Sequence, residues 1–471
     1  MNRPPRILVS AGEASGDLYA SLVVEELRRR YPGAEFFGST GPHLRAAGVR
    51  TVVDAASLAV VGLLEVVPDL LRVYRQYRKL LAAARASRPD IAILTDSPDF
   101  HLRVARRLAL VGVPVVYLVA PQVWAWRKGR LKTMRRTLKR LLCIFPFEEE
   151  FFRREGVPAD YIGHPLAGLV RPSLARDEFF RKHELPAGRP LIAVLPGSRR
   201  GEAARHLPAL MEAVQLLNRE RAMSFVLPAS ATTGAAFFRD RTRGSGIRVI
   251  EGESWDTMAH STLALAASGT VTVEAALLGT PMVSFYRVTA ISWLLGKLLV
   301  RVPFYSMVNL IAGRPVVPEL MQSQMTGERI ASEARRLLGD EAARGEMLAG
   351  LAEVRRKLEA RAAAPLGARA ATPAEADGRA AAPAERAAAT PATPAGRAAA
   401  TPAERAAATP ATPAERAAAT PAERAAATPA TPAGRAAATP AEPDARAAAT
   451  PAARAAAIVG EILQGEAAHV S

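Results

Sequence analysis

The chain has 471 residues, 49% of them hydrophobic, which is enough for two or three domains with real cores. Its formal net charge of +17 favours an acidic partner: anionic lipid, a phosphorylated substrate or nucleic acid. Only +3 of this excess lies in residues 361–456. The single cysteine, Cys143, excludes a disulfide framework and is expected to be buried. The metal-ligand spacings CxxC and HExxH are absent, so a protein-ligated zinc site is not predicted, and no cofactor is expected.

The N-terminus leads directly into an apolar strand without a signal peptide, so a cytoplasmic location is expected. Residues 108–126 carry no charge and are long enough to span a bilayer. Gly112, Pro114 and Pro121 interrupt them, however, and 113–119 is rich in β-branched residues. A helix end, a loop and a buried strand are therefore predicted in place of a membrane-spanning helix.

The first predicted unit is a strand at 6–10, a loop of small residues at 10–17, and an amphipathic helix. Such a loop lies at the carboxyl edge of a doubly wound sheet, where ligands bind. It does not match GxGxxG, so a dinucleotide site is not supported. Glu13 and Asp17 suit an acceptor that offers hydroxyl or amine groups, and Ser15 and Gly16 lie between them.

The next predicted strand is 34–38. A strongly apolar stretch lies further along the chain, at 58–71, and leads into Arg72, Arg75, Arg78 and Lys79. It is interpreted either as a core helix with a solvated basic face or as a surface segment that enters a membrane. The candidate membrane contacts are Leu63, Leu64, Val66, Val67, Leu70, Arg72 and Arg75.

A strand at 91–95 ends in Asp96-Ser97-Pro98-Asp99, so two carboxylates at a strand end are candidates for a general base. Helix capping by Asp99 is the alternative. After a strand at 115–119, Gln122 and Trp124 begin a basic, tryptophan-containing stretch that suits nucleic acid or a membrane face, but no nucleic-acid motif accompanies it. A strand at 141–145 follows, and His164 either lines the cleft or ends a strand.

The second unit begins with a strand at 191–195 and a glycine-containing turn, in which Gly197 and Ser198 precede Arg199, a residue suited to clamp a diphosphate. Strands at 223–227, 247–250 and 263–267 alternate with helices. Ser268, Gly269 and Thr270 then open a helix whose backbone N–H groups attract phosphate. Glu274 lies one turn further on, where a carboxylate is suited to accept hydrogen bonds from ribose hydroxyls. An ordinary strand–helix turn is the alternative.

The rest of the chain begins with a basic amphipathic helix at 290–301, another candidate lipid contact, and a polar loop at 308–322. Helices are predicted over 327–360. An Ala/Pro/Thr/Arg repeat follows, with arginines spaced alternately by 11 and 8 residues. It lacks large apolar side chains and is predicted to be disordered. Amphipathic helix returns at 455–463, so the repeat is interpreted as an insertion.

Several motifs together resemble lipid-A-disaccharide synthases, which are GT-B glycosyltransferases of family 19. They are SAGEASGD at 10–17, TDSPDF at 95–100, APQVWAWR at 120–127, PGSR at 196–199, SGTVTVEAALLGTPM beginning at 268 and VNLIAGR at 308–314. The resemblance implies two Rossmann-like doubly wound domains that face a cleft, 1–167 for the acceptor and 168–360 for the UDP-sugar. The insertion is then 361–454, and the helix within 455–471 crosses back to the first domain.

The resemblance also implies an inverting transfer of 2,3-diacylglucosamine from UDP to the 6-hydroxyl of 2,3-diacylglucosamine 1-phosphate, without a tightly bound metal. Asp99 is then the expected base and Asp96 the second choice. Arg199 and the amides of 268–270 would stabilise the leaving UDP, and Glu274 would hold the ribose. Glu13, His164, Asn309 and Arg314 would line the sugar sites. The family usually has IDAPDF where this chain has Thr95-Asp96-Ser97-Pro98-Asp99-Phe100, and both carboxylates are kept.

The expected partners are the two acylated sugars and the anionic cytoplasmic face of the inner membrane, with no nucleic acid. A homodimer is compatible with the sequence, which leaves the oligomeric state open. Two alternatives remain. One is another UDP-sugar enzyme of this fold, either a peptidoglycan-lipid N-acetylglucosaminyltransferase or a UDP-sugar 2-epimerase. The other is a non-catalytic membrane-surface scaffold.

Overall fold

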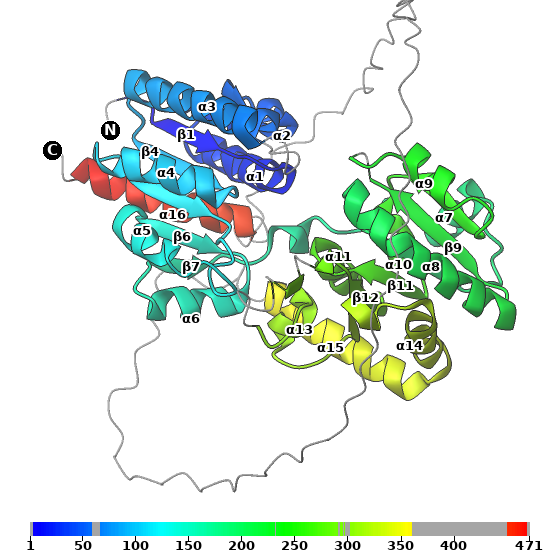
Figure 1. Cartoon of the computed structure of the whole chain (residues 1–471). Helices are drawn as coiled ribbons and strands as arrows, with labels where there is room; N and C mark the ends of the chain where they lie inside the picture. The colour runs from blue at the N-terminus through cyan, green and yellow to red at the C-terminus, as the bar shows by residue number, and fades with distance from the viewer. Residues whose placement is uncertain are drawn as a thin grey trace, which may run out of the picture. The chain divides into compact units, whose positions relative to one another are not determined.

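The computed structural model describes residues 3–58, 66–230, 232–290, 293–294, 296, 302–359 and 450–468 of the chain. These residues form two parallel β-sheets, each with helices packed on its faces (Figure 1). Residues 361–449 of the repeat region and most of the helix expected at 290–301 lie outside the described residues.

The first sheet has seven parallel strands in the order β3-β2-β1-β4-β5-β6-β7. The strands are β1 (Arg6–Ser10), β2 (Glu35–Thr40), β3 (Arg50–Asp54), β4 (Ile91–Thr95), β5 (Val115–Leu118), β6 (Arg140–Cys143) and β7 (Ala159–Tyr161). The helices around it are α1 (Ala14–Arg30), α2 (Pro42–Ala46), α3 (Val66–Ser87), α4 (Pro98–Ala109), α5 (Arg130–Thr137) and α6 (Pro146–Arg154). Helices on both faces explain why the central strands β4 and β5 are buried along their whole length.

The second sheet has six parallel strands in the order β10-β9-β8-β11-β12-β13. The strands are β8 (Leu191–Leu195), β9 (Ser224–Ala229), β10 (Ile247–Glu251), β11 (Leu263–Ala267), β12 (Met282–Tyr286) and β13 (Glu319–Met321). The helices are α7 (Arg176–Lys182), α8 (Arg200–Glu220), α9 (Ala235–Arg241), α10 (Ser254–His260), α11 (Thr270–Leu278), α13 (Met307–Ala312), α14 (Gly327–Gly339) and α15 (Glu341–Glu359).

Each sheet reverses its strand order at one point, between β1 and β4 in the first sheet and between β8 and β11 in the second. The loops that leave two such strands diverge to opposite faces of the sheet, so a crevice opens at their carboxyl ends. The loops after β1 and β4 carry Glu13 and Asp96–Asp99. The loops after β8 and β11 carry Arg199 and Ser268–Thr270. The topology therefore brings together the motifs that the sequence places far apart.

The last helix, α16 (Pro451–Ala468), packs against α1 of the first sheet (Figure 1). It buries Ala456, Val459 and Leu463 in the core that α1 also enters. The helix expected at 455–463 is thus confirmed, and it begins four residues earlier.

Most strand predictions are confirmed to within two residues, and Cys143 is buried at the end of β6. The stretch 108–126 has the predicted form, because α4 ends at Ala109 and β5 is a buried strand. Among the described residues, no helix combines the length and the apolar character needed to cross a bilayer. No bounds were predicted for strands β3, β7 and β13. All three lie at sheet edges, and β7 and β13 have only three residues each, too few for a recognisable apolar run.

Candidate active site

Asp96 joins the two loops at the reversal point of the first sheet. Its Oδ1 accepts a hydrogen bond from the Gly12 N–H at 2.8 Å, and its Oδ2 accepts one from the Glu13 N–H at 3.1 Å. The carboxylate needs a glycine beside it, because a Cβ on Gly16 would lie 1.8 Å from Oδ2. Burial raises the pKa of Asp96 to about 7, against the lowering effect of these hydrogen bonds. The small residues of the 10–17 motif thus make room for a buried carboxylate.

The backbone at Asp96 and Ser97 is left-handed, with φ of 53° and 37°, a conformation that is costly for residues with a Cβ. The carbonyl of Asp96 accepts hydrogen bonds from the Tyr117 hydroxyl and from Nδ1 of His101. The Nε2 of His101 in turn lies 2.8 Å from the Ser10 hydroxyl. Burial lowers the pKa of His101 to about 4, so the ring is neutral and accepts from Ser10. These hydrogen bonds fix the start of α4 and hence the position of Asp99.

Asp99 lies in the first turn of α4, and its side chain is 70% exposed. Nη1 of Arg127 donates to its two oxygens at 2.8 and 3.1 Å, and Nη2 of Arg130 donates to Oδ1 at 2.6 Å. Partial burial would raise the pKa of Asp99, but the hydrogen bonds and charges of Arg130 and Arg127 outweigh it and hold the pKa below its usual value. The carboxylate is therefore ionised at neutral pH. Among the described residues, its hydrogen bonds come from these two arginines and not from a backbone N–H of α4.

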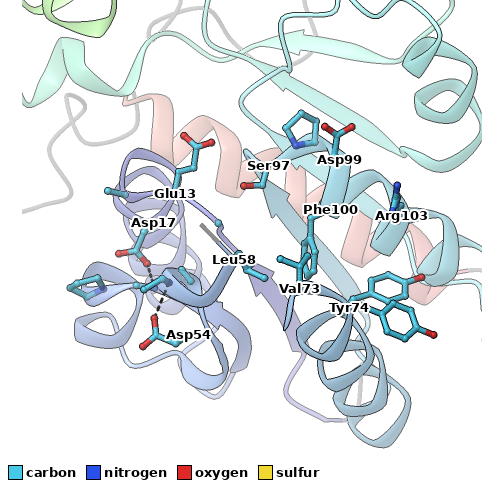
Figure 2. Close-up of a pocket in the computed structure, with 18 of the residues that line it drawn as sticks. Glu13, Asp17, Asp54, Leu58, Val73, Tyr74, Ser97, Asp99, Phe100 and Arg103 are labelled. Atoms are coloured by element: carbon cyan, nitrogen blue, oxygen red, sulfur yellow. Dashed lines mark hydrogen bonds between the residues drawn. The ribbon is translucent and has the colours of Figure 1, made fainter. Parts of the chain in front are cut away.

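A cavity of about 1350 Å³ opens beside these loops (Figure 2). Glu13, Ser97 and Asp99 line its polar part, whereas Asp96 does not line it. Arg199 and Thr232 also contribute to its wall. Of the two candidate bases, Asp99 is thus the one that a bound substrate can reach.

The reversal point of the second sheet is built around a buried histidine. Nδ1 of His206, in α8, donates to the carbonyl of Pro196 at 2.8 Å, and its Nε2 accepts from the N–H of Arg287 at 3.0 Å. Burial lowers the pKa of His206, which keeps the ring neutral as this pairing requires. Gly197 has a φ of 111°, and a Cβ there would lie 2.6 Å from Glu202. His206 and Gly197 together shape the turn that exposes Ser198 and Arg199.

The loop after β11 leads into α11 with Gly269 at the N-cap and Thr270 as the first helical residue. The Ser268 hydroxyl donates to the carbonyl of Tyr305 at 3.0 Å. Glu274 is half-buried one turn further on, and burial raises the pKa of its carboxyl, partly offset by a hydrogen bond with Trp255. Gly279 ends the helix in the left-handed conformation.

Several predicted site residues make structural contacts. The Asp17 carboxylate lies on the cavity wall, but it accepts hydrogen bonds from backbone N–H groups at the start of α2, those of Gly41, His43 and Leu44. The Asn309 side chain is buried and binds the backbone of Val316 and Val317. These contacts favour positioning roles for Asp17 and Asn309.

The remaining predicted acceptor residues are not among the described residues that line the cavity. Trp124 donates to the buried carboxylate of Glu148 at 3.2 Å. His164 is buried, and its Nδ1 accepts from the N–H of Leu166. Arg314 pairs with Glu353 at 2.9 Å. Ser15 and Gln122 are exposed.

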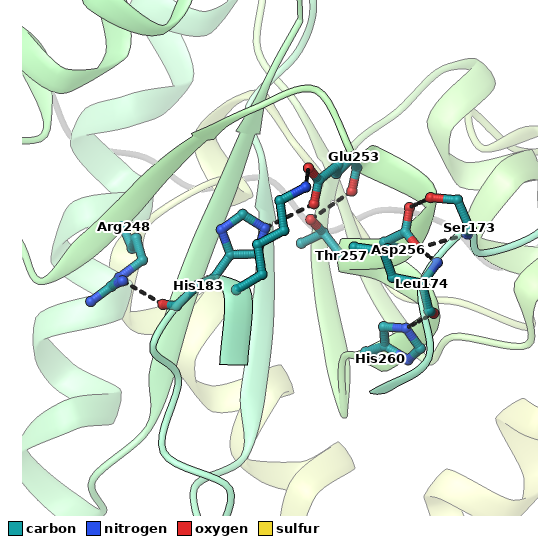
Figure 3. A network of polar contacts seen from close by, with 9 residues as sticks. Ser173, Leu174, His183, Arg248, Glu253, Asp256, Thr257 and His260 are labelled. Carbon is teal, nitrogen blue, oxygen red and sulfur yellow. Dashed lines mark hydrogen bonds and ion pairs between the residues drawn. The ribbon is translucent and has the colours of Figure 1, made fainter. Parts of the chain in front are cut away.

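A second polar cluster, around α10, is structural (Figure 3). Asp256 is buried and accepts from the N–H and hydroxyl of Ser173 and from the N–H of Leu174. Glu253 pairs with Lys182 at 2.6 Å and lies 2.8 Å from Nε2 of His183. The cluster ties the segment around α7 to the second sheet domain. Among the residues that the structure describes, no group of three or more His, Cys, Asp or Glu side chains is arranged to hold a metal ion.

Sequence reasoning missed several residues that hold the loops of the candidate site in place. Arg127 and Arg130 belong to a basic run that gives no sign of which members contact Asp99. His101, Tyr117 and His206 lie inside apolar or helical patterns where nothing distinguishes them from core residues. Only the strand order, which is a property of the fold, brings them next to the loops.

Comparison with known proteins shows the family to which the chain belongs. The family model for lipid-A-disaccharide synthetase matches residues 7–364. A lipid-A-disaccharide synthase from Solibacter usitatus (strain Ellin6076) is 74% identical over 361 residues, which cover 77% of this chain and 95% of that protein. One from Myxococcus xanthus (strain DK1622) is 45% identical over 361 residues, 76% of this chain and 94% of that protein.

Solved structures match the fold at low sequence identity. The UDP-GlcNAc 2-epimerase from Neisseria meningitidis bound to UDP-GlcNAc has a TM-score of 0.55 at 12% identity, over 75% of this chain and 98% of that one. The glycotransferase of kitacinnamycin has a TM-score of 0.54 at 15% identity, over 76% and 95%. These likenesses support the GT-B fold, and the family match is far more specific. The chain is a glycosyltransferase and belongs to the lipid-A-disaccharide synthase family.

Proposed function

We propose that this enzyme transfers 2,3-diacylglucosamine from UDP to the 6-hydroxyl of 2,3-diacylglucosamine 1-phosphate, with inversion, to give a β(1→6) disaccharide 1-phosphate and UDP. The observation that carries the proposal is the ionised, accessible carboxylate of Asp99 at the polar end of the cavity. An inverting displacement needs one base at the acceptor hydroxyl and charge stabilisation at the leaving group.

Asp99 is the base in this proposal. Arg127 and Arg130 keep it ionised, so it is ready to accept the proton of the 6-hydroxyl while the glycosidic bond to UDP breaks. Asp96 positions the loop that carries Glu13, and Glu13 is placed to bind a sugar hydroxyl. The lowered pKa makes Asp99 a weak base in the free enzyme, so proton transfer depends on how closely the 6-hydroxyl is held against its carboxylate.

The leaving diphosphate is assigned to the second sheet domain. The backbone N–H groups at the start of α11, near Ser268, Gly269 and Thr270, suit an anion, and Arg199 adds a guanidinium. Gly197 and Ser198 complete the adjoining turn. Glu274 would bind the ribose hydroxyls, and its raised pKa is compatible with hydrogen bonding in either protonation state.

We also assign the enzyme to the cytoplasmic face of the inner membrane, bound at its surface. Helix α3 supports this, because Leu71 and Tyr74 are more than half exposed beside Arg75 and Arg78. Arg72, Val66, Val67 and Leu70 belong to the same helix, whereas Leu63 and Leu64 lie outside the described residues. Of the second candidate contact, 290–301, the structure describes little, but Leu294 is exposed.

The test is transfer of label from the ³²P-labelled acceptor into the disaccharide, with UDP-2,3-diacylglucosamine as donor. Asp99→Asn should lower kcat by about 10²- to 10⁴-fold, the usual contribution of a general base. Asp177→Asn is the matched control, because Asp177 is an exposed carboxylate on α7 and should keep full activity. Full activity in Asp99→Asn would move the base elsewhere. Wild-type protein that makes no disaccharide but epimerises UDP-N-acetylglucosamine would overturn the proposed reaction.

A further inference from the structure

The cavity beside Asp99 has a second end with a different character (Figure 2). Leu58, Val73, Tyr77 and Phe100 line it, and the rings of Tyr77 and Phe100 meet edge to face at 6.2 Å. Such a wall offers almost no hydrogen-bond partners to a sugar or a phosphate. It suits an apolar ligand that is continuous with whatever lies at Asp99.

Helix α4 connects the two ends. Asp99, Arg103, Arg107 and Leu110 follow one another at helical spacings of four, four and three residues, and all of them line the cavity. At about 1.5 Å per residue, Leu110 lies about 16 Å along the helix from Asp99. This is the length scale of an extended fatty acyl chain whose head is held at Asp99.

The far end opens at an apolar and cationic rim. Leu110 and Val111, just beyond α4, are 76% and 66% exposed, and Leu71 and Tyr74 of α3 are 57% and 56% exposed. Arg103, Arg106 and Arg107 are exposed, and none has a carboxylate within ion-pair distance among the described residues. Apolar side chains next to unpaired guanidinium groups suit the boundary between acyl chains and phosphates of a bilayer.

We propose that the α3–α4 end of the cavity is the binding site for an acyl chain of the sugar acceptor, which enters from the bilayer across this rim. The inference rests on the proposed function, since it takes an acylated sugar as the ligand. The chain lies against Val73, Tyr77 and Phe100, and the sugar reaches Asp99. Arg103 and Arg107 line the path between them and bind phosphate.

The test measures binding by calorimetry with two soluble probes, glucosamine 1-phosphate carrying either a ten-carbon or a four-carbon N-acyl chain. Val73→Trp fills the apolar end and should weaken binding of the ten-carbon probe by roughly 10- to 100-fold, because several methylene groups lose their burial. Binding of the four-carbon probe should change by less than about threefold. Tyr77→Ala enlarges the same space and should shift preference towards longer chains. Ala82→Trp, at an exposed position of α3 that does not line the cavity, is the matched control.

The outcomes separate this inference from the proposed function. Equal weakening of both probes in Val73→Trp, or no dependence on chain length in the wild type, would overturn the acyl site even if the enzyme makes disaccharide. Selective loss of the ten-carbon probe would support the site even if no transfer were found. Circular dichroism of both variants shows whether they are folded, and Tyr77→Ala reports on the site independently if Val73→Trp is not.

Discussion

At the scale of single residues, Asp96 and Asp99 are two carboxylates three positions apart with opposite environments. Burial raises the pKa of Asp96 to about 7, whereas Arg130 and Arg127 outweigh partial burial and lower that of Asp99. Asp96 does not line the cavity, so its charge acts through the N–H groups of Gly12 and Glu13. It is a positioning residue in this interpretation.

This assignment predicts a pH dependence. As the pH falls through about 7, Asp96 gains a proton and loses an acceptor for the Gly12–Glu13 loop, so kcat/KM should fall below pH 7 although Asp99 stays ionised. Asp96→Asn should have low activity that no longer changes between pH 6 and 8. The measurement is the pH profile of kcat/KM for both proteins. A wild-type profile that is flat down to pH 5 would contradict the role of Asp96.

The contribution of Asp96 to the free energy of unfolding should change with pH in the opposite direction to kcat/KM. The pKa of Asp96 is raised in the folded state above about 3.9 in the unfolded chain. The folded protein therefore binds the proton more tightly, and this group makes the free energy of unfolding fall as the pH rises from about 4 to 7. Low pH thus favours the fold at this position while it reduces activity, so protonation of Asp96 should lower kcat/KM near pH 7 without destabilising the fold through this group.

Some residues of the candidate site could be predicted from the sequence, and others could not. Asp96, Asp99, Glu13 and Arg199 follow strands in small-residue loops, a pattern that sequence shows directly. Asp17 was expected to face the acceptor, but its carboxylate accepts N–H bonds at the start of α2. A carboxylate suits both acceptor binding and hydrogen bonding to the start of α2, and only the packing of α2 decides between these roles.

At the scale of elements, the central strands could be predicted because parallel strands buried on both faces are continuous apolar runs. The edge strands β3 and β13 could not, since β13 has only three residues and β3 begins with two exposed ones. The apolar stretch before α3 was ambiguous for a physical reason: a core helix and a membrane-surface helix bury the same kind of face. The exposure of Leu71 and Tyr74 favours the membrane.

Helix α3 gives a prediction on membrane binding. Changing Arg72, Arg75 and Arg78 together to Glu should move the enzyme from the membrane to the soluble fraction, because each basic residue near an anionic surface contributes about 1 kcal/mol of attraction. Sedimentation with vesicles of 30% anionic lipid at several salt concentrations measures it. Arg219, Arg239 and Arg335, on helices of the second sheet domain, provide a control with the same change in charge. Equal loss of binding in that control would show that net charge, and not α3, is responsible.

At the scale of the whole molecule, the chain leaves the described fold after α15 and returns at α16. The end of α15 and the start of α16 lie close together. The carbonyl of Leu358 and the ring of Pro451 lie 3.5 and 3.2 Å from the position that a Cβ on Gly163 would take. The hydroxyl of Tyr161 also donates to the carbonyl of Leu358. The sequence predicted an insertion between helices, but only the structure shows that its ends are neighbours.

This geometry predicts that the insertion can be shortened. Replacing residues 362–447 with a flexible linker of about ten residues closes the same short gap with far fewer residues. The entropy of loop closure then favours the folded state by about 2 kcal/mol more than in the full chain. Urea unfolding should show a higher midpoint, and the rate of disaccharide formation should be unchanged. Ending the chain at residue 449 is the opposite control, because it removes Val459 and Leu463 from the core beside α1 and should destabilise the protein. A short-linker variant that is less stable, or that loses activity while α16 remains, would show that the repeat makes contacts on which the fold or the site depends.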